Sequence, residues 1–228
     1  AGAVWTVRCV GIWLVHAGAQ CSAAGAGPML GAMPATIFDT PFVAPLMRAL
    51  ARALLGLAGW RVEGTLDARA RRCVVIAAPH TSNWDMPYTL LGAFALGMHI
   101  RFLAKASLFR PPFGAPMRWL GGVAVDRDHA GHTVAASVAA LKAAPGPLQL
   151  VLSPEGTRDR VRQWKTGFHH IARGAGLPIQ LAYLDYGTRR CGLGPLIDAG
   201  EDLDADLARI KAFYVPFRGR NPDQFDAR

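Results

Sequence analysis

The pair of residues best suited to acid–base chemistry is His80 and Asp85, five positions apart. On one continuous helix their side chains would point about 140° apart, because each residue turns the helix by about 100°. They can meet if His80 lies in a loop and Asp85 lies in the first turn of the next helix. Ser82 is a natural N-cap residue, and with Asp85 it forms the Ser-x-x-Asp pattern of a capping box. The spacing predicts contact between imidazole and carboxylate, and a purely capping role for Asp85 is the alternative.

A carboxylate beside the His80 ring would fix the tautomer of the ring and stabilise the imidazolium that forms when the ring accepts a proton. The free Nε2 of such a ring can remove the proton of an alcohol, a role worth about 10²–10⁴ in rate. The pattern contains no paired nucleophilic side chain. It therefore favours direct attack by a hydroxyl of the substrate.

A second polar cluster runs from Ser153 to Arg158, directly after an apolar run. Gly156 lets the backbone pass close to a ligand, and Thr157 offers a hydroxyl. The planar guanidinium of Arg158 matches the geometry of a phosphate group. Two further basic residues follow other strand-like runs and add positive charge to the same place: Lys105 and Arg127. For the basic residues further along, a solvated surface is at least as good an interpretation: Arg160, Arg162, Lys165 and Arg173.

Strands and helices alternate along the part of the chain that must position these clusters. Apolar, β-branched runs predict strands at Cys73–Ala78, Ile100–Ala104, Val123–Val125, Leu148–Leu152 and Ile179–Leu184. Helical patterns lie at Asn83–Leu96, Thr133–Ala143, Gly167–Gly174 and Asp202–Phe213. We therefore expect one α/β domain over residues 61–228, with a central, mostly parallel or mixed sheet flanked by helices. The two polar clusters follow strand ends, where such sheets form their sites. The polar tail after Pro216 is expected to fray.

The formal net charge of +9 indicates an anionic partner, which is nucleic acid, a membrane surface or a phosphorylated substrate. Nucleic acid is disfavoured because the aromatic residues lie mostly in apolar runs. Residues 33–60 are predicted to contain an amphipathic helix, which either lies on an anionic membrane surface or simply covers the core. Its leucines fall at helical spacing, with two arginines toward another face: Leu46, Leu50, Leu54 and Leu57, with Arg48 and Arg52. No apolar stretch is long enough to predict a spanning helix.

Residues 1–32 differ from the rest, with one charge, Arg8, and a Gly/Ala-rich end. We interpret them as a leader that is disordered or not native, with Met33 as the true start. A secretory signal peptide cleaved after Ala17-Gly18-Ala19 is the alternative. The four cysteines are widely spaced, which predicts neither a disulfide framework nor a zinc site and suits a reducing compartment.

Four blocks of the sequence together resemble a known family, the glycerolipid acyltransferases of the lysophosphatidic acid acyltransferase group. His80-Thr81-Ser82-Asn83-Trp84-Asp85 resembles their HX4D block, and Pro154-Glu155-Gly156-Thr157-Arg158 resembles their phosphate-binding block. The second block of the family is matched by Lys105, Leu108-Phe109 and Gly121–Arg127. The start of its fourth block is matched by Leu177-Pro178-Ile179. The resemblance covers roughly residues 42–185, with the blocks in the order of the family.

This resemblance implies a glycerolipid-acyltransferase-like fold and the transfer of a fatty acyl group to a lysophospholipid hydroxyl, as in 1-acylglycerol-3-phosphate. It implies acyl-CoA or acyl-carrier protein as the donor, with no metal and no organic cofactor. His80 would be the base and Asp85 its partner. The binding set that we expect is Ser82, Lys105, Arg127, Glu155, Gly156, Thr157 and Arg158. Backbone N–H groups at the helix start near Ser82 are candidate donors to the oxyanion. We expect peripheral, monotopic attachment to the cytoplasmic face of the membrane, the inner membrane of a bacterium.

Departures from the family pattern leave the identity of the acceptor open. They are Pro79, Trp84, Ser153, Asp159 and the Leu181-Ala182 pair in the fourth block.

Three other functions stay open at this stage. A serine esterase or lipid hydrolase would use Ser82 or Ser153, although no Gly-x-Ser-x-Gly motif is present. A non-catalytic phospholipid-binding protein would need the same phosphate and membrane features. A metalloenzyme would lack a usual ligand spacing such as HExxH.

Overall fold

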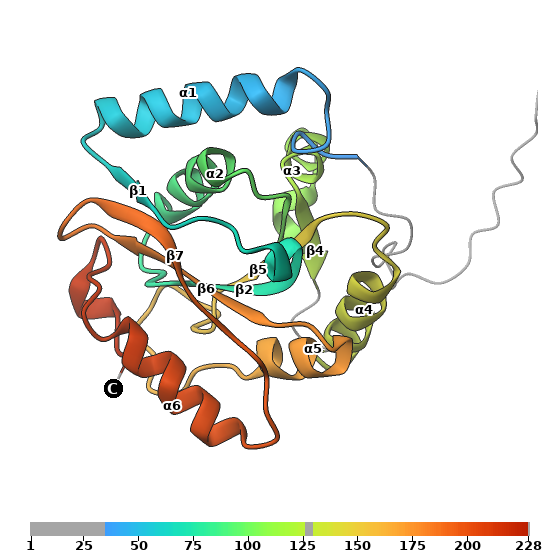
Figure 1. Ribbon diagram of the computed structural model, residues 1–228, viewed down its shortest axis with the longest axis vertical. Helices are drawn as coiled ribbons and strands as arrows, with labels where there is room; N and C mark the ends of the chain where they lie inside the picture. Colours follow the sequence, from blue (N-terminus) through green and yellow to red (C-terminus); the bar gives the residue numbers. More distant parts are fainter. Residues whose placement is uncertain (1–34, 126–129, 228) are drawn as a thin grey trace, which may run out of the picture.

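The computed structural model describes residues 35–125 and 130–227, which form a seven-stranded sheet with helices on both faces (Figure 1). The strands are β1 (Arg61–Glu63), β2 (Arg72–Ala78), β3 (Ile100–Lys105), β4 (Gly122–Val125), β5 (Leu148–Leu152), β6 (Ile179–Asp185) and β7 (Arg190–Ile197). The helices are α1 (Val43–Leu57), α2 (Asp85–Leu96), α3 (Gly114–Trp119), α4 (Ala130–Ala143), α5 (Gly167–Ala175) and α6 (Leu203–Tyr214). The predicted leader, residues 1–32, lies outside the described residues.

The order of the strands in the sheet is β1-β7-β6-β2-β5-β3-β4. The strands from β6 to β4 in this order are parallel, whereas β7 is antiparallel to β6 and β1 is parallel to β7. The mostly parallel or mixed sheet predicted from the sequence is confirmed. Because five neighbouring strands run in one direction, their carboxyl ends meet at one edge of the sheet.

The core has two layers, one on each face of the sheet. Alternate residues of β2 point to opposite faces, so Ile76 belongs to the core cluster that includes residues of α4, α5 and α6, while Val75 belongs to the cluster that includes residues of α2. Figure 1 shows α1, α2 and α3 on one side of the sheet and α4, α5 and α6 on the other. Strands buried on both faces read as continuous apolar runs, which is why the sequence predicted them well.

Helix α1 packs mainly on α2 as an outer layer (Figure 1), and it also contacts the edge strand β1 of the sheet. Ala51 and Leu55 are its buried residues. Arg52 Nη2 donates to Ala95 O over 3.1 Å, and the Arg48 guanidinium lies against Gly97, which ends α2. The predicted basic edge of α1 thus contacts the carbonyl end of α2, where a positive charge is favourable.

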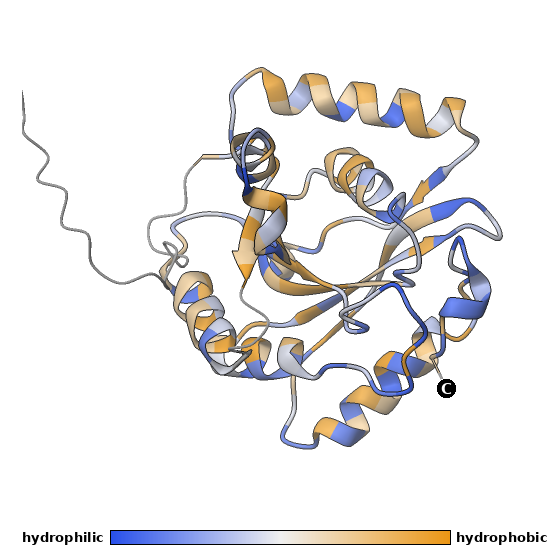
Figure 2. Cartoon of the chain, turned by 180° about the vertical axis from the view of Figure 1, so that it is seen from behind, coloured by the Kyte–Doolittle hydropathy of each residue, from blue (hydrophilic) through white to orange (hydrophobic). Residues whose placement is uncertain are grey.

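The opposite side of α1 is an exposed apolar face. Figure 2 shows α1 as an outer helix in which the orange of hydrophobic residues predominates. Its large side chains are Phe42, which precedes the helix, and Leu46, Leu50, Leu54 and Leu57. Among the described residues, no helix has the length and hydropathy needed to cross a membrane.

The polar segment after Pro216 is ordered along the site edge of the sheet, so the expectation that it frays is wrong. Phe225 contacts Trp164, and Ala227 is buried in the core. Its polar groups also bond to loops: Asn221 Nδ2 donates to Thr81 O over 2.8 Å, and Asp226 O accepts from Trp164 Nε1 over 3.2 Å. The segment is held by partners far away in the chain, which its own composition does not reveal.

Candidate active site

Three loops that follow parallel strands carry the polar residues of the site. β2 ends at Ala78 and leads to His80, β5 ends at Leu152 and leads to Glu155, and β6 leads to Tyr186. All three loops leave the same edge of the sheet because these strands are parallel. Ligands of open α/β sheets bind at this edge.

His80 and Asp85 are in contact, as the sequence predicted. The distance from His80 Nδ1 to Asp85 Oδ2 is 3.2 Å. The His80 side chain is 28% exposed, while that of Asp85 is 3% exposed. With Nδ1 against the carboxylate, Nε2 lies on the far side of the imidazole ring and is the nitrogen available to a substrate.

The Asp85 carboxylate accepts three hydrogen bonds besides its contact with His80. Oδ2 accepts from the backbone N–H groups of Thr81, over 2.7 Å, and Ser82, over 2.8 Å. Oδ1 accepts from the hydroxyl of Tyr186 over 2.8 Å. Burial alone would raise the pKa of Asp85, but the bonds from His80, Ser82 and Tyr186 hold it below its ordinary value. Asp85 is therefore an ionised carboxylate beside the ring.

The start of α2 differs from the predicted capping box. The helix begins at Asp85 with Trp84 as its N-cap residue, and the Ser82 hydroxyl accepts from the Trp84 N–H over 3.2 Å. The N–H groups of Thr81 and Ser82 are both committed to Asp85. Among the candidate oxyanion donors at this helix start, the Ser82 N–H is thus bonded to Asp85 and the Trp84 N–H to the Ser82 hydroxyl, while an oxyanion role for the other N–H groups stays a prediction.

Glu155 ties the second loop to the first. Its Oε1 accepts from the backbone N–H of His80 over 3.0 Å, and its Oε2 accepts from the Ser153 hydroxyl over 2.8 Å. Burial raises the pKa of Glu155 above its ordinary value, although the His80 N–H and the Ser153 hydroxyl oppose that rise. Both carboxylate oxygens have protein partners, so Glu155 fixes the position of the loop that carries His80.

A pocket of about 960 Å³ opens beside the His80–Asp85 pair. Apolar residues of β3, α2 and α5, such as Phe102, Leu90 and Ile171, form much of its wall. Of the predicted site residues, those that line it are His80, Asp85, Lys105, Gly156, Thr157 and Arg158. Ser82 and Glu155 are not part of its lining, and Arg127 lies outside the described residues.

Lys165 is a further cation of this pocket, although its position in the sequence suits a solvated surface at least as well. Its side chain crosses the turn at Gly156, where φ is +66°. A Cβ at position 156 would lie 2.8 Å from Lys165 Cε, so glycine lets the lysine side chain lie directly over this turn, and its positive φ also favours glycine. Lys165 thus lines the same pocket as Arg158.

The cations of the pocket have no acidic partner among the residues that the structure describes. Surface arginines pair with carboxylates, as in Arg69–Asp198 at 2.6 Å and Arg160–Asp226 at 2.7 Å. Within residues 35–125 and 130–227, by contrast, no ion pair involves Lys105, Arg158 or Lys165. All three residues are exposed where they line the pocket, and no described carboxylate pairs with their charge, which favours an anionic ligand.

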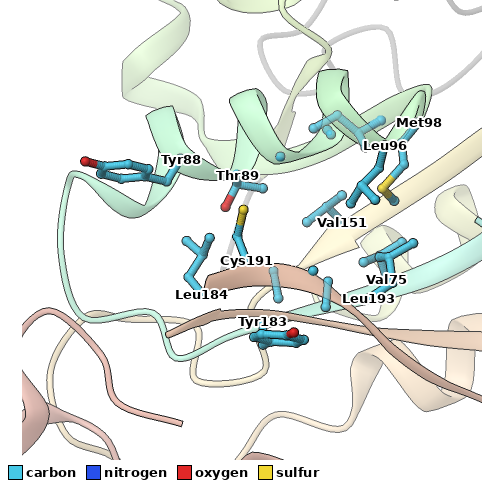
Figure 3. Close-up of a pocket in the computed structure, with 16 residues that line it drawn as sticks. Val75, Tyr88, Thr89, Leu96, Met98, Val151, Tyr183, Leu184, Cys191 and Leu193 are labelled. Carbon is cyan, nitrogen blue, oxygen red and sulfur yellow. The ribbon is translucent and has the colours of Figure 1, made fainter. Parts of the chain in front are cut away.

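A second cavity, of about 40 Å³, lies between α2 and the sheet (Figure 3). Figure 3 shows Thr89 and Leu96 on the helix side and Cys191 and Leu193 on the sheet side. Burial raises the pKa of the Cys191 thiol to about 11, which keeps it protonated near neutral pH. This cavity is too small for a lipid, and its cysteine is not an activated nucleophile.

Other histidines do not extend the site into a metal centre. The buried His169 Nε2 lies 3.0 Å from Asp206 Oδ2, which joins α5 to α6. Across the part of the chain that the structure describes, no three His, Cys, Asp or Glu side chains are arranged to hold a metal ion.

Tyr186 and Asn221 contribute to the site but were not predicted from the sequence. Tyr186 follows the end of β6 as His80 follows the end of β2, so its place beside a parallel strand was a usable signal. Asn221 bonds to Thr81 from 140 positions away, and no local pattern indicates that contact.

Comparison with known proteins links this site to one family. A family model described as acyltransferase matches residues 59–183, which include both the His80 loop and the Glu155–Arg158 loop. No curated protein sequence matches the chain.

Replacement of Asp85 by Asn tests the network around the carboxylate. The variant turns an amide N–H₂ toward the N–H groups of Thr81 and Ser82 or toward the hydroxyl of Tyr186, so at least one donor loses its acceptor. We expect the free energy of unfolding near neutral pH to fall by about 1–3 kcal/mol. Asp223→Asn, at an exposed position, is the control and should leave it unchanged.

The pH dependence of stability is the second readout for Asp85→Asn. Because the pKa of Asp85 is lower in the folded chain than in the unfolded chain, its ionisation stabilises the fold above the unfolded-state value. That stabilisation is lost as the pH falls through the folded-state value. Denaturant titrations from about pH 7 to about pH 3 should show a smaller acidic loss in the variant. Equal losses in both proteins would contradict an ionised Asp85.

Proposed function

Since the chain belongs to the acyltransferase family, we propose that it moves a fatty acyl group from a thioester donor to a hydroxyl of a phosphate-bearing lysolipid. The donor would be acyl-CoA or acyl-carrier protein, and the acceptor a lysophospholipid such as 1-acylglycerol-3-phosphate. One observation carries the proposal: the His80–Asp85 pair opens into a pocket whose cations have no carboxylate partner among the described residues. A general base and an anion-binding site thus face the same space.

The reaction would begin with His80. Its Nε2 removes the proton of the acceptor hydroxyl while the hydroxyl oxygen attacks the carbonyl carbon of the thioester. Asp85 stabilises the imidazolium that forms, and it does so as an ionised group. The tetrahedral intermediate then collapses, the C–S bond breaks, and the imidazolium returns its proton to the departing thiolate. The products are an ester and a free thiol.

The pocket would hold both ends of the acceptor, the phosphate group and the acyl chain. Lys105, Arg158 and Lys165 offer charge-assisted hydrogen bonds to the phosphate group, and Thr157 adds a hydroxyl. The apolar wall suits the acyl chain, and a volume of about 960 Å³ leaves room for both parts. A phosphate held at the cationic rim would place a neighbouring hydroxyl close to His80.

The positions of the serines support direct transfer over a serine esterase mechanism. The Ser153 hydroxyl donates to Glu155, and the Ser82 hydroxyl accepts from Trp84 N–H. Over the described ranges, no hydrogen bond joins the His80 ring to a serine hydroxyl. A serine nucleophile would need such a base.

The exposed face of α1 supports peripheral attachment to an anionic membrane surface at the cytoplasmic side. A row of leucines on an outer helix would be buried on entry into the headgroup region. Cys73 and Cys191 are free thiols, which fits a reducing compartment. Binding at the surface would give the pocket access to an acceptor that is itself a lipid.

His80→Ala is the direct test of the base. We expect kcat to fall by a factor on the order of 10²–10⁴, because no other group takes the hydroxyl proton. Binding of the lysophospholipid, measured by calorimetry, should stay within about twofold of the wild-type affinity. A variant that keeps wild-type kcat would exclude His80 as the base, and a wild-type protein that binds lysolipid without transferring an acyl group would identify a lipid-binding protein.

Arg158→Gln and Lys165→Gln test the phosphate site. Each should raise the KM for 1-acylglycerol-3-phosphate by about 10- to 100-fold, the loss expected for one charge-assisted hydrogen bond. The KM for a monoacylglycerol, which has no phosphate, should not change. Arg162→Gln is the matched control, since Arg162 is exposed in the same segment and does not line the pocket. Equal effects on both acceptors would contradict a phosphate site.

The double variant Leu50→Glu/Leu54→Glu tests the role of α1. Both side chains are more than 40% exposed, so the fold should keep its melting temperature, while binding to vesicles with anionic phospholipids should weaken at least tenfold. Val215→Glu is the control because Val215 is 54% exposed at the end of α6, on the other side of the sheet. Sedimentation with vesicles measures the effect. Unchanged binding of the double variant would exclude α1 as the attachment surface.

A further inference from the structure

We propose that the C-terminal segment Arg218–Ala227, here called the C-terminal strap, positions the loop after β2 that carries His80. Asn221 is the central residue of the strap. The strap would act on the peptide unit that joins Thr81 to Ser82. Activity serves here as a readout, so this part of the inference rests on the proposed function.

Asn221 and Gly219 hold Thr81 from the side opposite Asp85. Asn221 Nδ2 donates to Thr81 O over 2.8 Å, and Asn221 N donates to Thr81 Oγ1 over 3.2 Å. Gly219 passes so close that a Cβ there would lie 2.6 Å from Thr81 Oγ1. Thr81 is 1% exposed, so it lies enclosed between the strap and the carboxylate.

Because the peptide bond is planar, the contact between Asn221 and Thr81 O also affects the hydrogen bond from Ser82 N–H to Asp85. Thr81 C=O and Ser82 N–H belong to one rigid unit and point in opposite directions. Asn221 fixes the carbonyl end, and the N–H end donates to Asp85 Oδ2 over 2.8 Å. A rotation of this unit would turn a donor away from the carboxylate that orients His80. The strap thus controls a hydrogen bond of Asp85 without contacting it.

The strap also joins this loop to the loop that carries Arg158. The amide of Gln224 lies 2.9 Å from Thr81 O and 3.0 Å from Arg158 O, and both contacts are hydrogen bonds when its nitrogen faces the two carbonyls. Beyond it, the Asp226 carboxylate pairs with Arg160 over 2.7 Å. One segment therefore sets the distance between the base and the phosphate-binding loop.

The strap is anchored at both ends, which makes it rigid enough for this role. Arg218 N donates to Asp185 Oδ1 over 3.1 Å, and Arg218 O accepts from Tyr186 N over 2.9 Å. At the other end Ala227 is buried in the core. The strap thus contacts all three loops of the site, and through Tyr186 it is linked to Asp85, to which the Tyr186 hydroxyl donates.

Asn221→Asp tests the proposal with almost no change of shape. It places a carboxylate oxygen against Thr81 O, so the donor is lost and the peptide unit is repelled. We expect kcat to fall about 5- to 10-fold or more, with the KM of the lysophospholipid within about twofold. Asp223→Asn, at an exposed position of the same strap, is the matched control and should keep wild-type kcat. Gln224→Glu, which loses two weaker donors, should lower kcat less and serves as the test if Asn221→Asp does not fold.

The backbone amide signal of Ser82 is the readout that needs no substrate. In nitrogen-15 NMR spectra it should shift in Asn221→Asp and stay in place in Asp223→Asn. This readout tests the strap even if the wild-type protein transfers no acyl group, so the two proposals fail separately. An unchanged kcat and Ser82 signal in the folded Asn221→Asp variant would overturn the inference, as would a KM that rises as much as kcat falls. If only Gln224→Glu folds, a wild-type kcat in that variant would overturn it.

Discussion

The site depends on one buried carboxylate that stays ionised. Moving such a group out of water costs several kcal/mol unless hydrogen bonds and a charge partner replace the lost hydration. For Asp85 the replacement comes from two backbone N–H groups of the loop after β2, the hydroxyl of Tyr186 and the His80 ring. Each donor must stay in place, because a half-satisfied buried charge would be worse than none. The ionised carboxylate in turn fixes which nitrogen of His80 faces the pocket.

The rest of the site follows from the need to hold those donors. Parallel strands bring the loops after β2, β5 and β6 to one edge, and Glu155 fastens the second loop to the backbone of His80. The small residue Gly156 lets Lys165 lie over the turn before Arg158, and both cations line one pocket. The proposed base and the proposed anion site therefore lie together at the carboxyl ends of the strands.

How far the sequence predicts this protein depends on the range of each interaction. The contact between His80 and Asp85 and the place of the Glu155–Arg158 loop after a strand were predicted because local spacing and strand ends indicate them, and the ends of α2, α4, α5 and α6 were predicted to within three residues. β1 and β7 were missed: β1 has three residues, and β7 contains Gly192, whose missing side chain lets it approach Glu63. Tyr186 and the C-terminal segment act across more than 100 positions, where no periodicity reports a contact.

The tautomer of His80 is the most direct measure of the central claim. Nitrogen-15 NMR of the imidazole, assigned by comparison with His80→Gln, identifies which ring nitrogen carries the proton when the ring is neutral. We expect the proton on Nδ1, where it donates to Asp85, and an unprotonated Nε2 that can accept a proton; in Asp85→Asn this preference for Nδ1 should be lost. A neutral ring that carries its proton on Nε2 would contradict the account, because no base would then face the pocket.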